Sequence, residues 1–67
     1  MEQGVAKVIE LLADGTDVES AVANGYAQAK KSVRNVRGVW VDGIQALIEN
    51  DEITGYRVNL KVTFVVD

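Results

Sequence analysis

The sequence predicts an α+β fold in which one helix covers one face of a three-stranded antiparallel sheet. Three observations indicate this βαββ order: two segments rich in β-branched residues, an amphipathic segment between them, and a closing segment with strict alternation of apolar and polar residues. At 67 residues, the chain is expected to form a single domain, residues 1–67, near the size at which one core barely suffices.

The first strand is predicted over residues 5–12, VAKVIELL, and the turn-forming residues ADGTD follow it. A helix is predicted from about residue 17 to 34. Thr16 or Asp17 is expected to be its N-cap, with Thr16 and Glu19 forming a capping box. Gly25 lies inside the helix and predicts close approach of another backbone. The apolar stripe recurs at spacings of three and four: Val18, Ala21, Val22, Tyr26, Ala29 and Val33.

The second strand is predicted from Val36 to about Ile48, with Gly43 as a bulge or bend. A polar hairpin turn, ENDE, is expected at residues 49–52. The third strand follows over residues 56–66, where a period of two gives one apolar and one polar face. The polar face holds Arg57, Asn59, Lys61 and Thr63.

These elements predict the strand order 2-3-1. The second and third strands form an antiparallel hairpin, and the helix provides a crossover that lets the first and second strands run parallel. A central third strand satisfies both relations. One helix of about 17 residues spans roughly 25 Å, so it cannot cover long strands completely. Apolar sheet surface is therefore expected to remain for neighbouring copies.

The composition limits the classes of function. The chain has no Cys and no His, which excludes disulfides and the common zinc, haem and iron–sulfur sites. With 48% hydrophobic residues, self-association is the expected way to cover apolar surface. The net charge of −3 and the scattered basic residues argue against a nucleic-acid partner. No membrane span or signal peptide is predicted, so a cytoplasmic location is expected.

No catalytic constellation is recognisable, so an enzyme is not expected. Ser20 and Ser32 have no identifiable activating partner. The acidic residues Glu49, Asp51 and Glu52 form a turn, for which solvation is favoured over calcium binding because the regular ligand spacing is absent. No metal site is predicted.

The single tryptophan, Trp40, is the main candidate binding residue. Strict alternation would place Val36, Gly38, Trp40, Asp42 and Ile44 on one face, where an aromatic ring beside a glycine makes a shelf with an empty place. On the residues alone, core or interface packing is favoured over stacking on a ligand.

Two polar residues are further candidates. Arg57 is either a solvent-facing charge or a planar donor aimed at an acidic or heteroaromatic ligand. Gln45, on the second strand, is equally able to donate or accept a hydrogen bond.

The chain resembles the dodecin family over nearly its whole length, through AKVIELLADGTDVESAV, AQAKKSVRNVRGVWV and GYRVNLKVTFVV. The resemblance implies a non-enzymatic βαββ protein, twelve copies of which form a hollow shell that stores or sequesters flavins such as riboflavin and its phosphate, FMN. In flavin-binding members a tryptophan of the second strand stacks on the flavin ring, and a glutamine after the tyrosine of the third strand hydrogen-bonds it.

With Tyr56 as the anchor, the family's tryptophan falls at Gly38 and its glutamine at Arg57, while Trp40 lies roughly 6 to 7 Å further along the strand. The resemblance implies a flavin or similar flat aromatic ligand at Gly38 and Arg57, and with the candidates from the residues themselves the expected binding residues are Trp40, Arg57, Gly38 and Gln45. Some members lack the stacking tryptophan and carry arginine after the tyrosine, as this chain does. The alternative is therefore a flavin-free shell with a structural, ion-binding or other small-molecule-binding role.

Overall fold

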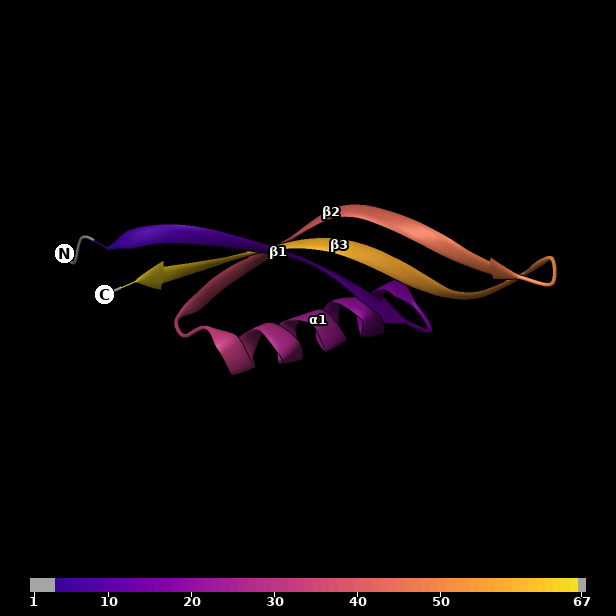
Figure 1. The fold of residues 1–67 in the computed structure, drawn as a ribbon, viewed down its shortest axis with the longest axis horizontal. Helices are drawn as coiled ribbons and strands as arrows, with labels where there is room; N and C mark the ends of the chain where they lie inside the picture. Colours follow the sequence, from indigo (N-terminus) through magenta and orange to yellow (C-terminus); the bar gives the residue numbers. More distant parts are fainter. Residues whose placement is uncertain (1–3, 67) are drawn as a thin grey trace.

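The computed structural model describes residues 4–66, which form one sheet and one helix (Figure 1). In chain order the elements are β1 (Val5–Gly15), α1 (Val18–Ser32), β2 (Val36–Glu49) and β3 (Glu52–Val66). The sheet order is β1-β3-β2, and β3 pairs antiparallel with both neighbours. This is the predicted order 2-3-1 read from the other edge, so the predicted βαββ fold is confirmed.

The first strand is longer than predicted, because it continues through the residues that the sequence indicated as a turn. Asp14 and Gly15 still pair with Arg57 and Tyr56 of β3. The bend comes only after Gly15, where an added Cβ would meet the backbone of Ala21. The absence of a side chain at Gly15 therefore lets the chain turn tightly into the helix.

The helix begins at Val18, and its N-cap is Asp17. The Asp17 carboxylate accepts a hydrogen bond from the Ser20 backbone N–H at 2.7 Å, and Ser20 Oγ accepts one from the Asp17 backbone N–H at 3.2 Å. The predicted box between Thr16 and Glu19 is wrong, because the helix starts one residue later and Ser20 occupies its third position. The helix ends at Ser32, two residues before the predicted end.

The core lies between α1 and the central strand. Val58, Leu60 and Val62 of β3 are 0% exposed. The helix meets them with a stripe of its own buried residues, Ala21, Gly25 and Ala29. A Cβ at Gly25 would collide with the Leu60 side chain and touch those of Ala13 and Leu11. The predicted close approach at Gly25 is therefore present, but it is to side chains of the sheet and not to another backbone.

The pairing of β2 with β3 shifts register at Arg37 and again at Asp42. Each is an extra residue on β2, which is the definition of a bulge. The bulge predicted at Gly43 is thus present directly beside it. A third shift occurs near the end of the hairpin, between Leu47 and Ile48.

These bulges change which residues of β2 share a face, so the predicted grouping is wrong. Val36 and Ile44 lie opposite apolar residues on the helix-covered face of β3, whereas Gly38 and Trp40 lie opposite polar residues on the other face. Asp42 is itself a bulge residue. Each inserted residue reverses the side to which the following residues point. We call the face of the sheet that does not carry α1 the open face.

The β2–β3 hairpin projects past the helix and gives the molecule dimensions of 52 × 19 × 14 Å (Figure 1). Its tight turn is formed by Asn50 and Asp51, whose φ angles of 52° and 65° suit the central positions of a type I′ turn. The third strand therefore starts at Glu52, four residues before its predicted start. Ile44, Ile48 and Ile53 are 58%, 61% and 58% exposed on this projecting arm.

Candidate functional site

All four residues predicted for the site lie on the open face. Gly38 is opposite Thr63, Trp40 is opposite Lys61, and Gln45 is opposite Arg57. Side chains directly opposite each other in antiparallel strands point to the same side. Trp40 and Gln45 are an odd number of residues apart, so strict alternation would separate them. The bulge at Asp42 brings them to one face.

The Trp40 ring is 70% exposed and has space on both sides along its strand. Its same-face neighbours on β2 are Gly38 and Gly43, neither of which has a side chain. A depression of about 310 Å³ is lined by Gly38, Val39, Trp40 and Thr63. Thr63 Oγ1 donates to the Gly38 carbonyl at 3.2 Å and so fixes the floor of this depression. The arrangement is an exposed indole on a rigid sheet, next to a depression that no side chain of residues 4–66 fills.

The Arg57 guanidinium is held by Asp14 of β1. Its Nε donates to Asp14 Oδ1 at 2.7 Å, and its Nη2 donates to Oδ2 at 3.0 Å. This bidentate bond lowers the pKa of Asp14 below its ordinary value of 3.8 and raises the pKa of Arg57. Arg57 is therefore partly engaged, and its remaining N–H groups are those available to a ligand.

Asp14 is the site residue that the sequence interpretation missed. The predicted first strand ended at residue 12, which left Asp14 in a turn. Extending the alternation of that strand by two residues would have placed Asp14 on the polar side, in register with Arg57. The available signal was the opposite charge of the two residues in the antiparallel register.

Gln45 has a different environment from Arg57. Its side-chain amide makes no hydrogen bond to any residue between 4 and 66, and it is exposed. A second depression, of about 250 Å³, lies beside it on the open face and is lined by Leu12, Gly43, Ile44, Gln45, Arg57 and Asn59. Gln45 and Trp40 are opposite β3 residues four positions apart, or about 13 Å along the strand.

The rest of the polar row on β3 is also tied to the neighbouring strands. Asn59 Nδ2 donates to Glu10 Oε2 at 3.0 Å, and Lys61 Nζ lies 3.6 Å from Asp42 Oδ2. Each of these groups is accessible to water, so its contribution to stability is small. Their effect is to hold long side chains in fixed positions around the two depressions.

Metal binding and catalysis receive no support from the side-chain arrangement. In the described part of the chain, residues 4–66, no three acidic side chains lie close enough to hold a metal ion. Ser20 is used in the helix cap, where its Oγ donates to the Asp17 carbonyl at 3.2 Å. The helix of the described residues is too short and too polar to cross a membrane.

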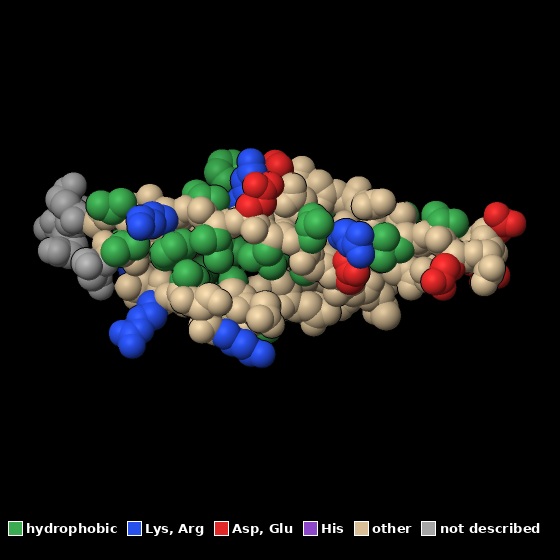
Figure 2. All heavy atoms as spheres, viewed as in Figure 1, with side chains coloured by type: hydrophobic (Ala, Val, Ile, Leu, Met, Phe, Trp, Pro, Cys, Tyr) green, Lys and Arg blue, Asp and Glu red, His purple; other side chains and the backbone are tan. Residues whose placement is uncertain are grey.

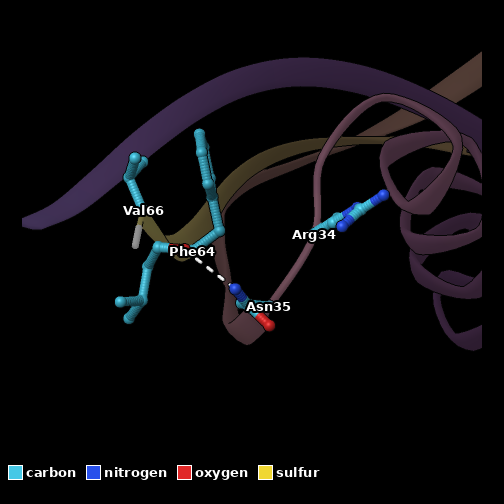
Figure 3. Close-up of a pocket in the computed structure, with 5 residues that line it drawn as sticks. Arg34, Asn35, Phe64 and Val66 are labelled. Atoms are coloured by element: carbon cyan, nitrogen blue, oxygen red, sulfur yellow. Dashed lines mark hydrogen bonds between the residues drawn. The ribbon is translucent and has the colours of Figure 1, made fainter. Parts of the chain in front are cut away.

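A third depression, of about 350 Å³, lies away from the predicted residues, where the α1–β2 loop meets the end of β3 (Figure 3). Figure 3 shows the Asn35 side chain pointing toward β3, where its Nδ2 donates to the Val65 carbonyl at 3.3 Å. Val65 N–H donates to the Asn35 carbonyl at 3.2 Å in return. These two hydrogen bonds fix the start of β2 and hence the position of Gly38.

Comparison with solved structures shows the same fold in three proteins. A single-residue variant of the dodecin of Thermus thermophilus is 27% identical, with 97% of this chain and 98% of that chain covered and a TM-score of 0.89. The dodecin of Streptomyces coelicolor is 25% identical, with 100% and 97% covered and a TM-score of 0.91. The dodecin of Streptomyces davaonensis shares the fold at 21% identity, with 98% of each chain covered and a TM-score of 0.91.

No curated protein sequence matches the chain significantly. The dodecin family model, however, matches residues 5–67, which include every strand, the helix and all four predicted site residues. The chain belongs to the dodecin family.

Proposed function

We propose that this protein is a non-enzymatic flavin-binding protein that assembles from several copies of itself and stores or sequesters riboflavin or FMN. The observation that carries the proposal is the exposed Trp40 ring on the open face, beside the empty places at Gly38 and Gly43. An indole held by a rigid strand offers a flat surface to a flat ring and needs little further ordering to bind it.

The polar groups of the open face supply hydrogen-bond partners for the edge of the ligand. The free amide of Gln45 and the remaining N–H groups of Arg57 can bond the heteroatoms at the edge of a flavin ring. The Asp14 bond fixes the guanidinium plane, which favours a directional contact over a flexible one. In this role Trp40 provides affinity, and Gln45 with Arg57 provides selectivity.

Self-association is part of the same proposal. A ring stacked on Trp40 of one chain leaves its second face in water, and a second copy that brings another Trp40 would cover it. The family pattern implied by the resemblance is a homododecamer with paired rings. The exposed apolar residues on both faces of the sheet supply surface for such contacts: Val8, Leu12, Val41 and Ile44 among others. We propose a cytoplasmic location for the assembly.

A second function is favoured by two observations. Gly38 has no ring where flavin-binding dodecins carry their stacking tryptophan, and Arg57 is already bonded to Asp14. Under this alternative the protein is a flavin-free shell with a structural, ion-binding or other small-molecule-binding role, and Trp40 packs between copies.

Riboflavin fluorescence titration separates the two functions. We expect the purified protein to quench riboflavin at micromolar concentration and Trp40→Ala to weaken binding about tenfold or more, which corresponds to about 1.4 kcal/mol. Trp40→Phe is the matched control, because it keeps a smaller flat ring and is expected to retain part of the affinity.

The variant Gly38→Trp combined with Arg57→Gln restores the family's pattern. The nearest atom to an added Cβ at Gly38 is the Thr63 hydroxyl at 3.3 Å, so the Thr63 side chain must shift slightly to admit the new residue. Quenching by this variant, but not by the wild-type protein, would contradict the flavin proposal and establish the flavin-free alternative. Quenching by both, with loss in Trp40→Ala, would support flavin binding at Trp40.

A further inference from the structure

Two apolar surfaces of the molecule extend beyond the open-face site and are not covered by any residue between 4 and 66; the first shares Gly38 with that site. The first is a groove of about 580 Å³ between α1 and the beginning of β2, which we call the helix groove. Val22, Ala23 and Tyr26 line it from the helix, and Val36 and Val39 line it from the strand. Its charged lining residues are Glu19 and Arg37.

The second surface is the end of the β2–β3 hairpin, which we call the acidic tip. Ile48 and Ile53 lie opposite each other there, and both are more than half exposed. The next cross-strand pair, Glu49 and Glu52, and the turn residue Asp51 supply three carboxylates at the same end of the hairpin. None of the three forms an ion pair within residues 4–66.

The tip is acidic, whereas cations gather at the end of α1 and beside the helix groove, whose own lining holds one acid and one base. The end of α1 and the residues beside the helix groove hold four cations, none in an ion pair within residues 4–66: Lys30, Lys31, Arg34 and Arg37. Lys30 Nζ lies 5.0 Å from the centre of the Tyr26 ring, which places a positive charge at the wall of the groove. Figure 2 shows blue side chains below the left half and red ones at the right-hand tip.

One chain cannot bring its own tip into its own groove. The groove lies at the start of β2. Figure 1 shows the turn of the hairpin at the opposite end of this strand. Val39 and Ile48 are nine residues apart on one extended strand, or about 30 Å. The groove of each chain is therefore open to the tip of another.

We propose that the acidic tip of one copy docks in the helix groove of the next. Ile48 and Ile53 fill the apolar groove, while Glu49 and Glu52 face Arg37 and Lys30. The carboxylate of Glu19 at the other end of the groove repels the tip's acids and so sets its direction. This contact joins two different surfaces, so it is head-to-tail and closes into a ring when the rotation permits. It rests on the self-association in the proposed function and does not require flavin.

Thiol cross-linking tests the contact directly, because the chain has no cysteine. We introduce Ile48→Cys at the tip and Ala23→Cys in the groove, both at exposed positions, and treat the proteins with a short bis-maleimide. Each single variant is expected to stay monomeric on a denaturing gel. An equimolar mixture of the two gives covalent dimers, and the double variant gives higher multimers.

Cross-linking of Ile48→Cys to itself would show a tip-to-tip contact and overturn the proposal. An assembled native mass with no covalent product from the mixture would overturn it as well. So would a wild-type protein that is monomeric at high micromolar concentration.

Charge exchange provides an independent readout. Glu49→Lys with Glu52→Lys, or Arg37→Glu with Lys30→Glu, is expected to raise the concentration of half-assembly about tenfold, since each pair places like charges in contact. All four substitutions together should restore assembly. If the variant with all four substitutions fails to assemble while circular dichroism shows a native fold, the proposed pairing of the tip's carboxylates with Arg37 and Lys30 is contradicted.

The two proposals fail separately. Tip-to-groove cross-links in a protein that does not quench riboflavin would contradict flavin binding alone. Riboflavin quenching in a protein that forms no such cross-links would contradict this contact alone.

Discussion

The two faces of the sheet differ in how their residues are held, although the same strand supplies the centre of both. On the helix-covered face, Val58, Leu60 and Val62 are completely buried. On the open face, Arg57, Asn59 and Lys61 are partly exposed and bonded to the outer strands. Burial of apolar area is worth far more than exposed polar contacts. The first face therefore supplies stability, and the second is free to carry a binding site.

The largest expected effect is a loss of stability at Leu60, on the helix-covered face. Leu60→Ala removes a fully buried side chain that touches the helix at Gly25, so we expect a loss of roughly 2 to 5 kcal/mol in the free energy of unfolding. Urea denaturation at fixed protein concentration measures it. Asn59→Ala, the adjacent residue on the open face, is the control and is expected to cost less than about 1 kcal/mol. Equal losses in the two variants would show that the faces do not differ in this way.

Two glycines, one on each face, are expected to respond differently to the same substitution. Gly25→Val would push into Leu60 and Ala13, so we expect a destabilisation of roughly 1 to 3 kcal/mol. Gly43→Val on the open face meets only the Asn59 Cβ at 4.0 Å, and a β-branched residue favours strand conformation, so stability should be unchanged or higher by up to about 1 kcal/mol.

The same Gly43→Val variant bears on the binding site, because its side chain would fill the gap between Trp40 and Gln45. Thermal unfolding and riboflavin titration of both glycine variants check this. A stable Gly43→Val protein that binds riboflavin as the wild type does would show that the ligand does not use the gap.

The smallest expected effect is a change in acid sensitivity on the open face. Because the Arg57 bond lowers the pKa of Asp14 in the folded protein, the unfolded chain takes up the proton first as the pH falls. The stabilisation is complete above the ordinary pKa of 3.8 and is lost as the pH falls through the lower folded pKa. The N-cap Asp17, whose pKa is also lowered by its bond from Ser20, contributes in the same direction.

Denaturation midpoints at neutral pH and at about pH 3 measure this loss. Asp14→Asn should reduce the difference between the two midpoints slightly, Arg57→Gln should reduce it equally, and the double variant should show no further reduction. An additive double variant would show that the two groups titrate independently.

The sequence named four candidate residues, but it revealed neither Asp14 nor the arrangement of the candidate residues on the sheet. Trp40, Arg57, Gly38 and Gln45 are recognisable by residue type and by the resemblance, yet alternation assigned the wrong neighbours to Trp40. Of the two predicted N-caps, Asp17 is confirmed, but the capping box was wrong by one residue for a related reason, since Asp17 and Ser20 compete with Thr16 and Glu19 for the same role. In both cases a shift of one residue along the chain gives each side chain different partners. Local sequence patterns do not locate a bulge or a helix end to within one residue.

By itself, the sequence determined the order of the four elements, because the period of its apolar residues is two in the closing strand and near 3.6 in the helix, and short connections leave few ways to join them. Only the tertiary structure decided that Asp14 holds Arg57 and that the bulge at Asp42 places Gln45 on the same face of the sheet as Trp40. The reason is physical: a bulge and a cross-strand ion pair depend on residues far apart in the chain, which meet only when the strands are in register.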